Sequence, residues 1–263
     1  MKRVPVPTAT TAGGETNAYL VDEPAGSLPV DEPAGSLLVD PGARTDALDA
    51  AVAARDVTGI AVTHTHPDHV GGVAAYAAET GATVWARRGR EARFEAATGV
   101  VPDRTFADGE RVGGLTVLDT PGHAPDHVAL GTGDGVLVGD LARASGSVAV
   151  VAPEGDMRAY LVALRRLLAR DATRLYPGHG PVIDDPDATI RRLYHHRLDR
   201  ERRIERAVRS GADSVDAVLD AAYDRDLSGV RDLAAATVRA HLDKLAVERR
   251  VRFDAATGRV GPR

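Results

Sequence analysis

Short apolar runs alternate with longer amphipathic stretches through roughly the first 185 residues of the chain. The runs predict β-strands, and the stretches with apolar positions every three to four residues predict helices. The predicted strands cover 16–21, 37–40, 59–63, 82–86, 111–119, 128–130, 136–138, 148–151 and 174–176. The predicted helices cover about 45–55, 69–80, 87–98 and 157–170. This order indicates an α/β fold, a four-layer αββα sandwich with helices outside two facing sheets.

The pattern changes after Asp185-Pro186-Asp187, where a long arginine-rich helix is predicted through about Arg209. A second helix is expected after Ser214, because serine caps helix N-termini, and a third covers about 234–249. The segment 251–260 has the pattern of a β-hairpin. Helices followed by a hairpin are the ingredients of a small winged helix. We therefore expect two domains, 1–187 and a winged-helix-like 188–263.

Charge supports this division of the chain. Residues 1–187 carry 16 basic and 26 acidic side chains, whereas 188–263 carry 17 basic and 12 acidic side chains. The net charges are therefore -10 and +5, within a total of -5. An asymmetry of this kind predicts that the two parts have different partners.

Composition limits the chemistry and the location. Cysteine is absent, so disulfides and thiolate ligands are excluded, and any zinc must be held by His, Asp or Glu. The sequence contains no apolar run of about 20 residues, which a membrane-spanning helix requires. The basic start is not followed by the apolar region of a secretory signal. These observations predict a cytoplasmic protein with no membrane partner.

A direct repeat interrupts the first strands. Residues 21–28 (Val-Asp-Glu-Pro-Ala-Gly-Ser-Leu) recur at 30–37. Two copies are too few for a repeat architecture, and the Pro, Gly and acidic content indicates an extended loop between strands. We interpret the repeat as a tolerated duplication, because surface loops accept insertions at small entropic cost.

The densest chemistry in the chain lies at His64-Thr65-His66-Pro67-Asp68-His69, directly after an apolar run. Four side chains of metal-ligand type fall within six residues there. Imidazole and carboxylate together suit zinc or a similar divalent ion, and the short spacing lets one turn serve two metals. A strand that ends in such a turn places the ligands on a rigid scaffold.

Three further strand ends resemble this one in design. His123 lies in Thr120-Pro121-Gly122-His123, Asp140 follows Gly139, and His179 lies in Tyr176-Pro177-Gly178-His179. Each places a His or Asp beside glycine, which lets the backbone turn sharply and approach a ligand closely. An isolated histidine is usually a packed core residue, but packing alone does not explain seven ligand-type side chains at four strand ends. Of the nearby residues, His127 is expected to have a structural or supporting role, and Asp126 and Asp119 are candidate acceptors for the ligand imidazoles.

The complete set resembles the metallo-β-lactamase fold family over residues 15–185, and its turn matches the H-x-H-x-D-H motif of that family. By position, the resemblance implies His64, His66 and His123 as ligands of a first metal, Asp68, His69 and His179 as ligands of a second, and Asp140 as a bridge. The segment 177–181, the later His196-Arg197 and the winged-helix pattern are similar to the subgroup called β-lactamase-like protein 2. That subgroup includes members described as endoribonucleases specific for single strands.

These ligands imply a hydrolase with two divalent metal ions, most simply zinc, in which a metal-bound hydroxide attacks. Besides binding a metal, Asp68 is expected to orient the parent water or to accept its proton. The leading hypothesis is a phosphodiesterase acting on single-stranded RNA, with His196 and Arg197 as substrate contacts implied by the resemblance. The alternative for those two residues is a solvated or packed helix face. A second hypothesis is a glyoxalase II-like hydrolase of hydroxyacylglutathione thioesters or of lactones. A third is a non-catalytic nucleic-acid-binding module with structural metals, although structural zinc sites are normally closed and mononuclear.

Overall fold

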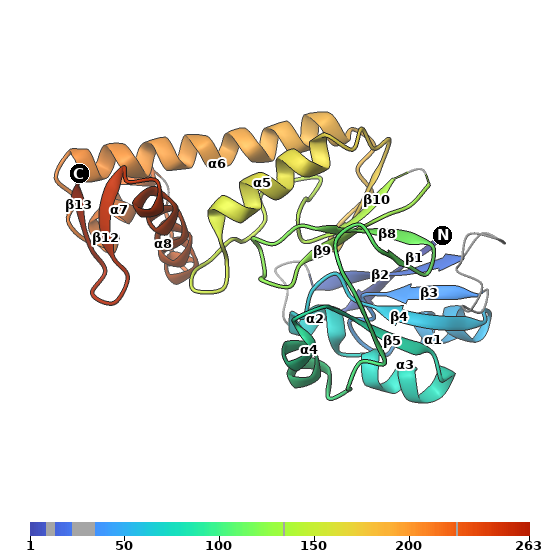
Figure 1. The fold of residues 1–263 in the computed structure, drawn as a ribbon. Helices are drawn as coiled ribbons and strands as arrows, with labels where there is room; N and C mark the ends of the chain where they lie inside the picture. Colours follow the sequence, from blue (N-terminus) through green and yellow to red (C-terminus); the bar gives the residue numbers. More distant parts are fainter. Residues whose placement is uncertain (9–13, 23–34, 134, 225) are drawn as a thin grey trace. The chain divides into compact units, whose positions relative to one another are not determined.

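The computed structural model describes residues 1–8, 14–22, 35–133, 135–224 and 226–263 (Figure 1). Most of the direct repeat at 21–37 lies outside these residues, so the loop predicted for it stays a prediction. By the proximity of their Cα atoms, the residues form two compact units. The first unit comprises Met1–Thr120, Asp126–Gly146 and Asp171–Pro186, and the second comprises Pro121–Pro125, Ser147–Arg170 and Asp187–Arg263. The predicted boundary at residue 187 stays a prediction.

Six strands of the first unit form one sheet in the order β1-β2-β3-β4-β5-β6. The strands are β1 (Lys2–Pro7), β2 (Glu15–Asp22), β3 (Ser36–Val39), β4 (Val57–Ala61), β5 (Thr83–Arg87) and β6 (Arg104–Phe106). Pairing is antiparallel from β1 to β3 and parallel from β3 to β6. The parallel part therefore brings the carboxyl ends of β3 and β4 to the same edge.

Five strands form the second sheet in the order β11-β10-β9-β8-β7. They are β7 (Arg111–Val112), β8 (Leu115–Asp119), β9 (Val128–Gly131), β10 (Val136–Gly139) and β11 (Leu175–Pro177). β7 to β10 are antiparallel, whereas β10 and β11 run parallel. β10 and β11 consequently end at the same edge, so the residues that follow them, including Asp140 and His179, begin close together.

Helices cover one face of the first sheet (Figure 1). They are α1 (Asp46–Ala53), α2 (Pro67–Val70), α3 (Val73–Thr80) and α4 (Glu91–Thr98). Alternate residues of each strand separate two cores. In β3, Leu38 packs toward the helices with Val52 and Tyr76, whereas Leu37 and Val39 pack against the second sheet. Two apolar layers therefore hold the strand ends rigidly in place.

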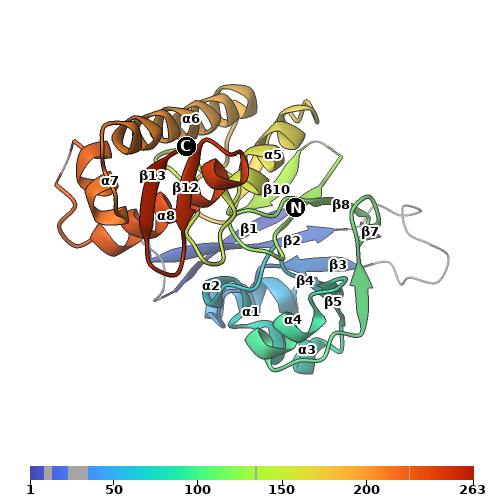
Figure 2. The ribbon, with the colours of Figure 1, turned by 60° about the vertical axis from the view of Figure 1, so that its left-hand side comes forward.

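The second unit contains four helices and a hairpin: α5 (Met157–Leu168), α6 (Pro186–Arg209), α7 (Val215–Ala222), α8 (Arg231–Val247), β12 (Val251–Asp254) and β13 (Arg259–Pro262). Ser214 caps α7 through a bond from the Ala217 N–H, as its sequence position predicts. β12 contacts α8, and the two hairpin strands pair antiparallel (Figure 2). The predicted hairpin is confirmed; the winged-helix identity of this part is not confirmed.

The structure adds two strands that the sequence did not predict and removes one that it did. β1 was not predicted, because its two prolines weaken a strand pattern; they are tolerated because β1 is an edge strand. β6 was too short to recognise. The strand predicted at 148–151 is wrong: Val148 and Val150 are buried, but the segment forms no strand. Carbonyl oxygens of this segment accept side-chain bonds instead, from Arg197 and from His123.

No helix among the described residues combines the length and the apolar character that crossing a bilayer requires.

Candidate metal centre

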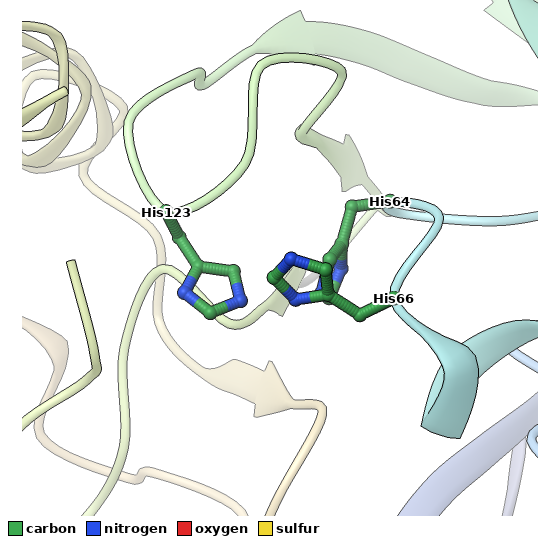
Figure 3. Close-up of side chains that lie close together, drawn as sticks. All are labelled: His64, His66 and His123. Carbon is green, nitrogen blue, oxygen red and sulfur yellow. The ribbon is translucent and has the colours of Figure 1, made fainter. Parts of the chain in front are cut away.

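The seven predicted ligand residues come together in three overlapping groups, each with its candidate ligand atoms within 4.8 Å of one another. The groups are His64, His66 and His123; His64, His69 and Asp140; and Asp68, His69 and His179. Figure 3 shows the rings of the first group lying close together, with His64 and His66 on one turn. The second group shares His64 with the first group and His69 with the third, so the three groups form one continuous cluster.

Four atoms of this cluster have the spacing of ligands around an ion. His179 Nε2 lies 3.3 Å from Asp68 Oδ2 and 3.2 Å from Asp140 Oδ1. His69 Nε2 lies 3.7 Å from each of the same two oxygens. Ligand bonds of 2.0–2.1 Å in a tetrahedral site place neighbouring donors roughly 3.3 Å apart. The donor set therefore fits a divalent ion between these four side chains.

The distal nitrogen of His69 is held by a buried carboxylate. His69 Nδ1 lies 3.0 Å from Asp40 Oδ2, and Asp40 also accepts bonds from the Thr63 N–H and the Thr63 hydroxyl. This contact favours the tautomer in which Nδ1 carries the proton and Nε2 faces the other ligands. Within the described residues, His69 Nε2 makes no hydrogen bond. Asp40 was missed by the sequence analysis, although its place between a strand and Pro41-Gly42 repeats the design of the other ligand turns.

The other imidazoles are oriented in the same way, chiefly by the backbone. His179 Nδ1 bonds to the Glu15 carbonyl at 2.8 Å, and His123 Nδ1 bonds to the Ala149 carbonyl at 2.6 Å. In His64, Nδ1 lies 3.2 Å from the Thr63 hydroxyl, and Nε2 lies 3.0 Å from His66 Nδ1. Each ring thus points a defined nitrogen at the cluster.

The structure separates the three residues proposed to support the cluster. His127 has a supporting position, because its Nε2 accepts the Asp140 N–H at 3.1 Å and its Nδ1 meets the Thr120 hydroxyl. Asp126 accepts the Thr65 N–H at 3.0 Å and therefore holds the backbone of the ligand turn. Asp119 forms an ion pair with Arg87.

Two glycines make room for this packing. Gly139 has φ +46°, and a β-carbon there would lie 2.5 Å from Thr63 Oγ1 and 2.9 Å from His127 Nε2. At Gly178 a β-carbon would lie 2.7 Å from His69 Cε1 and 2.8 Å from Asp140 Oδ1. Both positions therefore require glycine for close approach to the ligand side chains.

Opposite charges stabilise each other across the cluster. Burial would raise the pKa of Asp68, but the hydrogen bond from His179 and the charge of His69 outweigh it, so the pKa is lowered. Burial would lower the pKa of His179, but Asp140 and Asp68 raise it to about 10. In His69, burial is likewise outweighed by Asp40, and the pKa is raised. The arrangement is electrostatically suited to hold positive charge, whether as protons or as a metal ion.

The two predicted substrate contacts lie in the second unit, on α6. Arg197 is buried; its guanidinium donates to the Val148 carbonyl and lies 5.6 Å from the centre of the Tyr160 ring. His196 is half-buried, and burial together with the charges of Arg197 and Arg200 lowers its pKa to about 4. These positions fit a packed helix face, and the role in substrate binding stays a prediction.

The lowered pKa of His196 predicts a loss of stability in acid. Between about pH 6.5 and pH 4 the unfolded chain binds a proton at this ring and the folded chain does not, so stability falls as pH falls. Because the ring is partly solvated, we expect a contribution of about 1–2 kcal/mol. Urea unfolding of a His196→Gln variant should show a flatter pH profile in this range. The exposed neighbour provides the control, since His195→Gln should leave the profile of the parent chain unchanged; equal profiles for all three would contradict the prediction.

With this geometry established, comparison with known proteins gives the family. A family model described as the metallo-beta-lactamase superfamily matches residues 12–179. The chain belongs to the metallo-β-lactamase superfamily. The predicted α/β metallo-β-lactamase fold is confirmed, and the protein is a member of a hydrolase superfamily with a His/Asp site that could hold metal ions.

Individual relatives agree with this assignment. The chain is 30% identical to a "Beta-lactamase-like protein 2 homolog" of Drosophila melanogaster over 208 residues, 73% of this chain and 70% of that protein. It is 30% identical over 156 residues to "Thioesterase pkgB" of Emericella nidulans, matching 56% of this chain but only 42% of that protein. Among solved structures, a metallo-beta-lactamase family protein from Thermus thermophilus is 25% identical with a TM-score of 0.76, covering 100% of this chain and 98% of that one.

Proposed function

We propose that this protein is a dinuclear metal-dependent hydrolase. The observation that carries the proposal is the presence of two neighbouring ligand groups. The Nε2 atoms of His69 and His179 lie 3.2–3.7 Å from carboxylate oxygens of Asp68 and Asp140, and the candidate ligand atoms of His64, His66 and His123 lie within 4.8 Å of one another. His64, His66 and His123 would hold the first ion, Asp68, His69 and His179 the second, and Asp140 would bridge them. All seven ligands are nitrogen or oxygen donors, which favours zinc, while iron and manganese also suit such a set.

The side chains define what this centre would do. A pair of divalent ions would lower the pKa of a bound water to about 7 and would act as a Lewis acid that polarises the electrophile. In the metal-free protein, burial would raise the pKa of Asp68, but the hydrogen bond from His179 and the charge of His69 lower it, so its carboxylate is ionised at neutral pH and available as a ligand. We propose that the same carboxylate would orient the attacking water or accept its proton. Asp40 and the Glu15 carbonyl keep the rings of His69 and His179 in place as charge changes.

We propose a phosphodiester of single-stranded RNA as the substrate. The support is the similarity to the β-lactamase-like protein 2 homologue, together with the net positive charge of residues 188–263. Exposed arginines of α6 pair with acids on the same helix, as in Arg191 with Asp187 and Arg209 with Glu205. RNA would have to compete with these acids for the arginines. We therefore expect a modest dependence of binding on salt.

A thioester is the second candidate substrate. The similarity to a protein named thioesterase favours it, and an acyl carbon can be attacked by the same centre. Assays with both substrates therefore decide between attack on phosphorus and attack on carbon.

One experiment separates these functions. Metal-loaded protein is incubated with labelled single-stranded RNA and with hydroxyacylglutathione, each beside an Asp68→Ala variant and a chelator-treated sample. RNA cleavage that is lost in both controls is the expected result. Thioester turnover without RNA cleavage would establish the second candidate instead. Two bound ions with neither activity would support a nucleic-acid-binding role without catalysis.

A further inference from the structure

Three consecutive residues of β2 contact either the residues proposed to hold the second ion or the turn that carries one of them. The Thr16 hydroxyl donates to Asp68 Oδ2 at 3.3 Å, and the Glu15 carbonyl accepts from His179 Nδ1 at 2.8 Å. Asn17, the next residue of β2, contacts the backbone of the turn that carries His179. None of these β2 residues was recognised as functional from the sequence, where they only marked a strand.

Asn17 makes three bonds to a turn of four residues. Its side-chain amide donates to the carbonyls of Pro177 and Gly180, both at 2.9 Å, and its backbone N–H donates to the Gly178 carbonyl at 2.7 Å. The side chain is buried. An asparagine amide has two N–H donors, and here each meets a carbonyl of the turn. Aspartate, which has nearly the same shape, has no donor for either carbonyl when ionised.

The first ion position has different supports. The Thr65 N–H, between His64 and His66, donates to Asp126, and His64 Nδ1 contacts the Thr63 hydroxyl. Arg93, on α4, also contacts both Asp126 and the Thr65 hydroxyl. These bonds come from the segment between β4 and α2, from α4 and from the segment before β9, whereas Asn17 acts from β2 on the end of β11 and the residues that follow it.

We propose that Asn17 is a positioning residue for the second ion alone, and that it sets the affinity of that position independently of the His64 and His66 position. This inference rests on the proposed dinuclear function. The Pro177 carbonyl also accepts from the Tyr19 hydroxyl at 2.7 Å, and the Gly180 carbonyl also accepts from Arg3 at 3.0 Å. The two buried amide bonds complete this set, which fixes the turn 177–180 and with it the direction of His179 Nε2 toward Asp68 and Asp140. A carboxylate at position 17 would leave each carbonyl one donor short and would repel both, so the ring moves by more than the few tenths of an ångström that a metal site tolerates.

The test is metal titration of the metal-stripped full chain with Zn²⁺ and with spectroscopically visible Co²⁺. The parent chain is expected to bind two equivalents. Asn17→Asp should keep the first equivalent at parental affinity and bind the second about 10- to 100-fold more weakly, with loss of the absorption bands that the second Co²⁺ adds. Ser36→Ala is the matched control, because Ser36 is a buried polar residue of the neighbouring β3 that donates to Asp22; it should bind both ions as the parent does.

The outcomes distinguish the inference from the function on which it rests. If Asn17→Asp binds both equivalents at parental affinity, or loses both together while its circular dichroism stays native, the selective role of Asn17 is wrong. If the parent chain binds fewer than two ions, the dinuclear function itself fails. Should Asn17→Asp not fold, Asn17→Ser, which avoids placing a charge between the carbonyls, must show the same selective weakening or the inference is overturned.

Discussion

Alanine at position 178 is expected to abolish binding of the ion between His69 and Asp140. The added β-carbon would come within 3 Å of both side chains, closer than carbon and oxygen atoms pack. His69 cannot retreat, because it is fully buried and bonded to Asp40. We expect the affinity for the second metal equivalent to fall about 100-fold or more and hydrolysis to fall with it. Isothermal titration with Zn²⁺ measures the first effect directly.

Gly133→Ala supplies the control for this substitution. Gly133 lies between β9 and β10, with no described atom within 4 Å of the position of a β-carbon and no positive φ. The same added methyl group should leave metal binding unchanged there. Normal binding of two ions by Gly178→Ala would mean that the four ligand atoms do not surround an ion as proposed.

Asp40→Asn is expected to weaken the same ion by about 10- to 100-fold while the chain stays folded. Asn tolerates the φ of +53° found at residue 40, and it preserves the volume of the buried side chain. Its amide nitrogen, however, would replace the carboxylate oxygen that faces His69 Nδ1. That nitrogen donates, which favours the ring tautomer with its proton on Nε2, where a metal would bind.

This prediction is measured by zinc titration beside thermal unfolding of the metal-free protein. Asp184→Asn is the control: its carboxylate pairs with Arg174 at the surface and contacts none of the ligands. A variant at residue 40 that unfolds several degrees lower yet binds zinc as tightly as the parent would show that Asp40 serves folding only.

The sequence was sufficient to predict which side chains gather at the candidate metal centre, but not the residues that support them. His64, His69 and His179 were recognisable because each follows an apolar run and lies near a turn residue. This pattern is local, so it is visible in the sequence without knowledge of the fold. Asp40 and Asn17 act on residues 29 and about 160 positions away, so only the pairing of strands brings them into contact. In a strand with alternating apolar residues, a polar residue is interpreted as facing solvent, so the sequence does not indicate that it contacts another segment.

The strand predictions failed where tertiary contacts overrode the local preference of the sequence. The prolines of β1 argue against a strand until its place at the sheet edge is known, and the valines of 148–151 argue for one although its carbonyls serve Arg197 and His123. The position of Arg197 illustrates the same limit. Sequence alone placed it on a charged helix, and only packing shows that its guanidinium is buried.

The distal nitrogens of His69, His123 and His179 are all tied to acceptors that belong to the protein itself. The rings are therefore oriented before any cation arrives. Loading then requires the incoming ion to shed its hydration shell but requires little rearrangement of the polypeptide. We also expect these three rings to keep their orientation when the ion leaves, because the bonds to Asp40, Ala149 and Glu15 do not depend on the ion.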